Sequence, residues 1–176
     1  MSVLGELQPN KVFKYFEEIC SIPHGSRNLQ QISDYLVDFA KAHELKYRQD
    51  EDLNVIIWKD GSKGYEASEP VILQGHMDMV AVKEADCDKD MEKEGLDLEI
   101  NGDYISAKGT SLGGDDGIAV AYTLAVLDDE EMAHPPIEAI FTVNEEIGML
   151  GAATIDVSDL KGRLFMNMDS EDEGVF

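Results

Sequence analysis

Six side chains that can move protons or bind metals stand where apolar runs of the sequence begin or end. They are His76, Asp78, Asp115, Glu145, Glu146 and Asp169. If a fold gathers them, so many carboxylates at short range cannot all stay ionised unless cations neutralise them. A histidine among carboxylates suits zinc, cobalt or manganese better than calcium, which takes oxygen ligands alone. The residue types therefore predict a site for zinc or a similar divalent metal.

The segments around these residues alternate between helical and extended patterns. Apolar side chains recur near a period of 3.6 in two stretches, one behind Pro9 and one behind a capping Asn28, and a third stretch is apolar nearly all round. Shorter runs rich in β-branched residues and bounded by turn residues are typical of strands. The expected helices cover residues 9–20, 28–44 and 118–127, and the expected strands cover 46–50, 54–59, 70–78, 136–143 and 162–169. The charged region from Lys83 to Ile100 is expected to form a loop or an edge.

Helices that alternate with buried strands predict the α/β class. The expected architecture is a mixed, mostly parallel sheet with helices on both faces. In such sheets, binding sites lie beyond the carboxyl ends of the strands. Three expected strands lead to His76, Glu145 and Asp169, and Asp115 lies in the glycine turn GGDDG that opens the third helix. We therefore expect the six side chains to lie at one edge of the sheet.

The composition of the chain limits its partners and its location. Its 176 residues, 43% of them hydrophobic, suit one domain with one core. The 14 basic and 37 acidic residues give a formal net charge of -23, which would repel nucleic acid and anionic lipid. Two cysteines are too few for a disulfide framework, the first residues do not resemble a secretion leader, and no run approaches the ~20 apolar residues of a membrane span. We expect a cytoplasmic protein with no nucleic-acid or membrane partner.

Each feature of the predicted site has a plainer explanation when it is taken alone. A histidine after a strand is more often a hydrogen-bonded structural residue, Asp115 could cap a helix, and the Glu145–Glu146 pair could be a solvated turn. The acids of DSEDEG, from Asp169, could suggest a calcium loop, but the run before them is extended rather than helical. Phosphoryl transfer with Mg²⁺ is disfavoured, because the chain has no P-loop lysine motif and His76 is a poor Mg²⁺ ligand. The order and combination of the features favour the metal site.

Five motifs in order give the sequence a specific resemblance. SIPHGS, QGHMDMV, GTSLGGDDGIA, NEEIGMLGA and MNMDSEDEG resemble those of the bacterial aminoacyl-histidine dipeptidases, carnosine-cleaving relatives of the co-catalytic zinc aminopeptidases and carboxypeptidases. The resemblance runs from near Ile22 to the end of the chain. It implies a zinc-exopeptidase-like catalytic domain and the hydrolysis of dipeptides of the Xaa-His type, such as carnosine.

The resemblance also implies a role for each metal-binding position. His76 and Asp169 would bind one metal ion, Glu146 would bind a second, and Asp115 would bridge the two. The peptide bond between Asp115 and Asp116 would be cis. The implied cofactors are two divalent ions, zinc in the first place, with cobalt or manganese as alternatives.

Two further carboxylates receive roles by the same resemblance. Asp78, two residues after His76 on an extended segment, would orient that histidine. Glu145 would be the general base, taking a proton from a metal-bridging water and returning it to the leaving amine. Adjacent side chains of an extended chain point to opposite sides, so Glu145 and Glu146 need a bend before Gly148 if both are to face the site.

The chain differs from the resembled family at its end. Those enzymes continue with a lid or dimerisation domain and a C-terminal catalytic segment that supplies a last histidine ligand, whereas this sequence stops at Phe176. Residues 1–176 are therefore expected to be the N-terminal part of the catalytic domain of an enzyme that forms a homodimer when complete. By itself the chain is expected to hold at most one metal ion tightly and to be inactive. The alternative is a noncatalytic metal-binding or folding module built on the same half-fold.

Overall fold

The computed structural model describes residues 2–170, which fold into four helices and two sheets. The helices are α1 (Asn10–Cys20), α2 (Gln30–Ala42), α3 (Gly114–Leu127) and α4 (Leu150–Thr154). The strands are β1 (Lys46–Gln49), β2 (Val55–Lys59), β3 (Val71–His76), β4 (Leu98–Asn101), β5 (Tyr104–Ala107), β6 (Ile137–Thr142) and β7 (Leu164–Asn167). Helices and strands alternate along the chain, which confirms the α/β class.

The main sheet has five strands in the order β1-β2-β6-β3-β7. β3 runs parallel to both of its neighbours, β6 and β7, whereas β2 is antiparallel to β6 and β1 is antiparallel to β2. β1 therefore runs in the same direction as β6, so that four of the five strands share one direction. The prediction of a mixed, mostly parallel sheet is confirmed, and the carboxyl ends of β6, β3 and β7 lie side by side.

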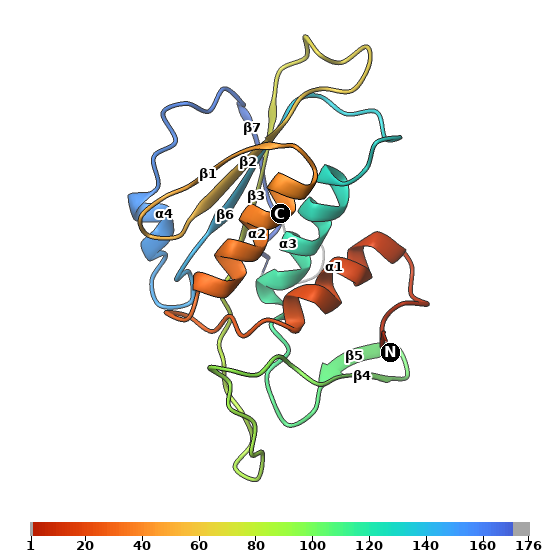
Figure 1. Cartoon of the computed structure of the whole chain (residues 1–176), viewed down its shortest axis with the longest axis vertical. Coiled ribbons are helices and arrows are strands. Elements are labelled where there is room, and N and C mark those ends of the chain that lie inside the picture. Colours follow the sequence, from red (N-terminus) through yellow and green to blue (C-terminus); the bar gives the residue numbers. More distant parts are fainter. Residues whose placement is uncertain (1, 171–176) are drawn as a thin grey trace.

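The three long helices α1, α2 and α3 pack on one face of the main sheet (Figure 1). Alternate strand residues point to this face, so Val55 and Ile57 of β2 join the same buried cluster as Phe16 of α1 and Leu124 of α3. The central helix α3 is apolar nearly all round because it is covered by α1 on one side and by the sheet on the other. This layer forms most of the core.

A smaller apolar cluster covers the other face of the sheet. Ile56, Ile72 and Ile140 are buried there, and Ile155 and Leu160, which follow α4, pack against them. The segment that begins at α4 therefore crosses to the second face before the chain returns to the sheet as β7 (Figure 1). Helices on both faces were expected, and the helix of this second layer is short.

The start of α3 lies close to the end of β3 because a glycine stands between them. A Cβ atom at Gly75 would lie 2.8 Å from Asp116 Oδ2 and 3.1 Å from the Cβ atom of Ala119. A larger residue at this position would therefore push α3 away from the strand. The close approach lets Asp116 Oδ2 accept the backbone N–H of His76 at 3.0 Å. It also brings Asp115 next to the strand that carries His76.

Some boundaries differ from the prediction because side chains bond elsewhere. Asn28 does not cap α2: the helix begins at Gln30 with Leu29 as its N-cap, and the Asn28 side-chain amide donates to the carbonyl oxygen of Glu92 at 2.9 Å. The short elements α4 and β5 are not predicted from the sequence, since five and four residues are too few to show a period. β5 pairs with β4 in a hairpin that stands apart from the main sheet (Figure 1).

β7 is an outer strand of the main sheet and is exposed on both faces. Leu164, Phe165 and Met166 are 60%, 54% and 48% exposed. Apolar side chains on both faces of this strand thus remain uncovered within residues 2–170. In the same part of the chain, no helix has the length and hydropathy needed to cross a bilayer.

Candidate metal centre

The carboxyl ends of β3, β6 and β7 meet the start of α3 at one edge of the main sheet. His76 is the last residue of β3, the Glu145–Glu146 pair follows β6, Asp169 follows β7, and Asp115 lies in the first turn of α3. Because β3 lies between β6 and β7, His76 stands in the middle of this edge. His76, Glu145, Glu146 and Asp169 therefore lie at or just beyond the predicted strand ends, and Asp115 lies in the predicted glycine turn. The part of the motif MNMDSEDEG beyond residue 170 lies outside the described residues.

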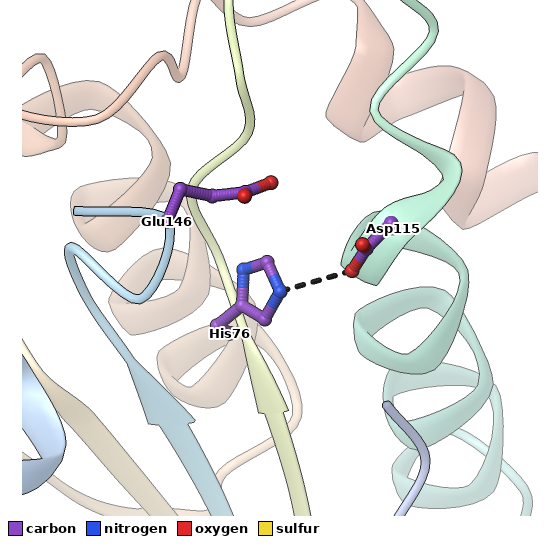
Figure 2. A group of neighbouring side chains, drawn as sticks. All are labelled: His76, Asp115 and Glu146. Atoms are coloured by element: carbon purple, nitrogen blue, oxygen red, sulfur yellow. Dashed lines mark hydrogen bonds and ion pairs between the residues drawn. The ribbon is translucent and has the colours of Figure 1, made fainter. Parts of the chain in front are cut away.

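His76 is the buried centre of this group, with a side chain that is 1% exposed. Its Nε2 atom lies 3.1 Å from Asp115 Oδ1 and 3.8 Å from Glu145 Oε2. Figure 2 shows Glu146 approaching the imidazole from the segment after β6, across from Asp115 on α3. Asp115 itself is 73% exposed, so the group is open to solvent on the side of α3.

Two sets of three ligand atoms gather around His76 among the described residues. One set joins His76, Asp115 and Glu146, the other joins His76, Glu145 and Asp169, and the atoms of each set lie within 4.8 Å of one another. Ligand atoms about 2.1 Å from a tetrahedral zinc ion are roughly 3.4 Å apart, so either set would close around an ion by small side-chain shifts. One imidazole nitrogen with carboxylate oxygens is a donor set that zinc, cobalt and manganese accept. The side chains therefore fit a divalent metal ion.

Asp78 lies behind His76 and bonds to three neighbours. It is buried; its Oδ1 accepts the backbone N–H of Glu145 at 3.0 Å, and its Oδ2 accepts the hydroxyl of Ser26 at 2.8 Å. His76 Nδ1 lies 2.9 Å from the backbone carbonyl oxygen of Asp78 and 3.5 Å from its Oδ1. A proton on Nδ1 would leave Nε2, which faces Asp115, free to bind a metal. This geometry supports the orienting role that the resemblance implies for Asp78, and the role stays a prediction.

The clustered charges shift the pKa values of the buried groups. Burial lowers the pKa of His76, but the hydrogen bond with Asp78 and the charges of the neighbouring aspartates outweigh burial and raise this pKa to about 9. Burial raises the pKa of Asp78, but the hydrogen bonds that its carboxylate accepts outweigh burial and lower it. Burial, and next the charge of Asp115, raises the pKa of Glu146. A cation between these groups would relieve the repulsion among the carboxylates.

The Asp116 side chain is part of the site, although the resemblance implies no role for it. It is 2% exposed, and its Oδ2 accepts the backbone N–H of His76. Burial raises the pKa of Asp116 to about 7, and the charges of Asp169 and Asp115 add to this effect. The peptide bond between Asp115 and Asp116 is cis, as the resemblance implies. The two adjacent aspartates of GGDDG are the sequence feature that could have indicated this role for Asp116. The motif does not show, however, which of the two carboxylates is buried.

The loop between α1 and α2 also belongs to the site. The Met79 N–H donates to the carbonyl oxygen of His24, and the Ser26 N–H donates to the carbonyl oxygen of Met79, both at 3.2 Å. The Arg27 N–H donates to Asn144 Oδ1 at 2.8 Å. The motif SIPHGS supports the resemblance, but it carries no spacing or residue type that would mark Ser26 as a neighbour of the site.

A cleft of about 1200 Å³ opens beside the group. Glu146 and Ile147 form one part of its lining, and residues 25–28, 79–83 and 88–93 form the rest. The lining includes both the α1–α2 loop and the segment that follows β3. The cleft therefore borders one of the candidate metal ligands, Glu146.

Known proteins resemble this chain in sequence and in fold, although no family model matches it. The cytosol non-specific dipeptidase of Escherichia coli is 40% identical over 174 residues, which are 99% of this chain and 36% of that protein. The crystal structure of aminoacylhistidine dipeptidase from Vibrio alginolyticus has 40% identity and a TM-score of 0.93, and the match covers 97% of this chain and 35% of that one. A tripeptidase from Staphylococcus aureus, with 23% identity and a TM-score of 0.76 over 94% of this chain and 44% of its own, shares the fold.

The chain thus spans about a third of the length of the first two relatives. The matched third includes every element of the candidate metal centre, because the match covers nearly the whole of this chain. The resemblance indicated by five short motifs is therefore confirmed, and it extends over nearly the whole length of the chain. Over nearly its whole length, the chain is therefore similar to about a third of the Escherichia coli cytosol non-specific dipeptidase and to about a third of the Vibrio alginolyticus aminoacylhistidine dipeptidase.

Proposed function

We propose that this chain is part of a metal-dependent dipeptidase that hydrolyses Xaa-His dipeptides such as carnosine. The observation that carries the proposal is the convergence of His76 with four carboxylates at the edge of the sheet. The names of the two relatives at 40% identity, a non-specific dipeptidase and an aminoacylhistidine dipeptidase, support peptide hydrolysis. The preference for a histidine at the second position is supported by the second name and by the motifs.

The proposed cofactors are two divalent metal ions, zinc in the first place, with cobalt or manganese as alternatives. His76 and Asp169 would hold one ion, Glu146 would hold the other, and Asp115 would bridge them. Bound there, a divalent ion would act as a Lewis acid: it would polarise a peptide carbonyl and lower the pKa of a bound water molecule. The two gathered sets combine the side chains differently, since Asp169 shares its set with Glu145 and Asp115 shares its set with Glu146, so the division of ligands between the ions stays a prediction.

Glu145 is the proposed general base. Its Oε2 lies 3.8 Å from His76 Nε2, so its carboxylate faces the same space as the candidate ligand atoms. A water molecule in that space would give a proton to Glu145 as the water oxygen bonds to the peptide carbonyl carbon. Glu145 would then pass the proton to the amine nitrogen as the C–N bond breaks, which frees the carboxylate for the next turnover. Asp78 would keep His76 oriented and would take no part in the proton transfer.

The peptide is proposed to lie in the cleft beside Glu146. Val80, Val82 and Ile147 are exposed side chains of its lining, and they offer apolar contact to a substrate side chain. The net charge of -23 supports a small peptide substrate over nucleic acid or an anionic membrane. The proposal includes a cytoplasmic location, which the name of the Escherichia coli relative supports.

We also propose that residues 1–176 are the N-terminal part of a catalytic domain. A lid or dimerisation domain and a C-terminal catalytic segment would complete the enzyme, which would form a homodimer. The exposed apolar residues of β7 support this, because an outer strand of this kind is suited to being covered by further protein. In this view the second metal ion lacks one of its ligands in the chain alone.

A chimeric enzyme tests the proposed function. This chain would replace the matching third of the Escherichia coli dipeptidase, and carnosine hydrolysis would be measured with Zn²⁺, Co²⁺ or Mn²⁺. The chimera should be active, His76→Ala should abolish its activity, and His43→Ala, just after α2 and away from the site, should not. The isolated chain, after dialysis, should retain at most one metal ion and should not hydrolyse carnosine.

The possible results separate the parts of this proposal. Two bound ions with turnover in the isolated chain would contradict the assignment of residues 1–176 as an incomplete domain. A folded chimera that binds metal and hydrolyses no dipeptide would favour a noncatalytic metal-binding module. A chain that binds no metal at any concentration tested would contradict the metal centre itself.

A further inference from the structure

Ser26 has a place in the site that neither metal binding nor proton transfer explains. Its hydroxyl oxygen lies 2.8 Å from Asp78 Oδ2 and donates a hydrogen bond to it. The candidate ligands come from strand ends and from α3, whereas Ser26 comes from the loop between α1 and α2. A hydroxyl from a separate segment thus reaches the carboxylate behind His76.

The Asp78 carboxylate is fully buried, with a side-chain exposure of 0%, and each of its oxygens has a different donor. Oδ1 accepts the backbone N–H of Glu145 at 3.0 Å, and Oδ2 accepts the hydroxyl of Ser26. A buried carboxylate needs such donors, because a charged group left without them is costly. The two oxygens also turn together about the bond to Cβ. The donor on Oδ2 therefore determines where Oδ1 points.

The loop that carries Ser26 is attached closely to the segment after β3. Gly25 forms a parallel bridge with Met79, and the Ser26 N–H donates to the Met79 carbonyl oxygen. A Cβ atom at Gly25 would lie 2.7 Å from the Cβ atom of Ala81, so a side chain at this position would force the loop away. The Ser26 hydroxyl is thus held at a defined position by backbone contacts that do not involve Asp78.

The same loop also contacts the segment after β6. The Arg27 N–H donates to Asn144 Oδ1 at 2.8 Å, and Asn144 directly precedes Glu145. Asn144 has a φ of 53°, which bends the chain, and the Glu145 carbonyl oxygen then accepts the Gly148 N–H at 2.9 Å. This bend is the feature that two adjacent glutamates need if both are to approach one site.

We propose that Ser26 is a positioning residue for the paired glutamates. Its hydroxyl holds the Asp78 carboxylate in the orientation that fixes the Glu145 backbone. Through that contact it sets where the Glu145–Glu146 pair stands relative to His76. The proposal rests on the proposed function in taking this pair as base and ligand, but the positioning itself can be measured without metal or substrate.

Amide hydrogen exchange of the chain, prepared with a chelator and resolved by NMR, measures this positioning directly. The amide of Glu145 reports its bond to Asp78, and the amide of Gly151, which donates to the Val143 carbonyl oxygen at 2.9 Å, reports the neighbouring backbone. Ser26→Ala should raise the exchange rate of the Glu145 amide about tenfold, the effect of losing one ordinary hydrogen bond. The exchange rate of the Gly151 amide should change by less than about twofold, since its own bond is untouched.

Matched variants separate the hydroxyl from the fold. Ser26→Thr keeps the hydroxyl and should restore the exchange rate of the Glu145 amide. Ser26→Cys keeps a weak donor, should give a smaller increase, and serves for the comparison if Ser26→Ala does not stay folded. Ser21→Ala is the control, because the Ser21 hydroxyl, just after α1, donates to the backbone carbonyl oxygen of Glu18 instead. Metal affinity is a second readout: Ser26→Ala should weaken it about tenfold, the lower end of what partners behind a metal ligand contribute.

Two results would overturn the proposal. One is an unchanged Glu145 exchange rate in a folded Ser26→Ala chain. The other is an equal increase at Glu145 and Gly151, which would show that the hydroxyl supports only general stability. A chain that binds no metal in any form would contradict the proposed function and would leave the exchange experiment to decide on Ser26.

Discussion

The proton carried by His76 should compete with metal binding. The pKa of His76 is raised to about 9, because the hydrogen bond with Asp78 and the neighbouring carboxylates outweigh the opposite effect of burial. An imidazole must be neutral to bind a metal, so the proton has to leave first. At pH 7, which is two units below this pKa, removing the proton costs about 2.7 kcal/mol, at about 1.36 kcal/mol per unit.

The direction of the pH effect follows from the sign of this shift. A raised pKa favours the protonated imidazole at every pH below about 9, so the apparent metal affinity should rise with pH. The rise should be about tenfold for each pH unit between pH 6 and pH 8, and about one proton should be released for each ion bound at pH 7. Asp116, with a pKa raised to about 7 by burial, can add a second proton at the acidic end of this range.

Competition with a chromogenic chelator at pH 6, 7 and 8 would measure the affinity. Calorimetry in two buffers with different heats of ionisation would count the protons. His76→Gln should lose both the affinity and its steep pH dependence. His24→Gln is the matched control: His24 is also buried, but burial lowers its pKa, so it carries no proton to displace near pH 7. A flat affinity from pH 6 to pH 8, or the same slope in His76→Gln, would refute the reasoning.

Two further expectations concern catalysis and stability. In the chimeric enzyme, Glu145→Ala should retain bound metal but lower kcat by about 10²- to 10⁴-fold, since it removes the proposed base and spares the proposed ligands; near-native kcat with full metal content would show that the base lies elsewhere. Lys59→Met should lower the free energy of unfolding, measured by urea titration, by about 1–3 kcal/mol. The Lys59 ammonium donates to three backbone carbonyl oxygens at and just after the end of α3: those of Val126 at 3.3 Å, Leu127 at 2.9 Å and Asp129 at 2.6 Å. Lys41→Met, which removes only a surface ion pair with Asp38, should stay within about 1 kcal/mol of the original chain, and an equal loss in both variants would contradict the capping role.

The layered fold was predictable because its longer elements have clear periods. α1 and α3 begin and end within a few residues of the apolar stretches that predict them, and the runs before His76 and Asp169 are strands. The prediction that Asn28 caps a helix was wrong. Its side-chain amide instead donates to the backbone carbonyl oxygen of Glu92, a residue far along the chain that no local pattern reveals. α4 and β5 were not predicted for a related reason: elements this short are stabilised by contacts with distant segments, which the sequence does not show.

The sequence predicts which residues of the candidate site lie close together, but it does not predict all the hydrogen bonds between them. Parallel strands end at a common edge, so the strand ends alone bring His76, Glu145 and Asp169 together. The sequence does not show that Asp116 turns inward to the β3 backbone, because this depends on how closely α3 approaches Gly75. It equally hides the bond from Ser26 to Asp78, which joins residues 52 positions apart.

The wide spacing of the site residues along the chain has a consequence for folding. His76 and Asp115 are 39 positions apart, and Asp78 and Glu145 are 67 apart. Contacts between such distant positions close large loops, which is slow, so the donor set is complete only after the strands have docked. A metal ion of the proposed centre would therefore have little to bind in the unfolded ensemble and would stabilise the native state by mass action. It would slow unfolding while leaving the folding rate almost unchanged, and metal content would then record how many molecules have finished folding.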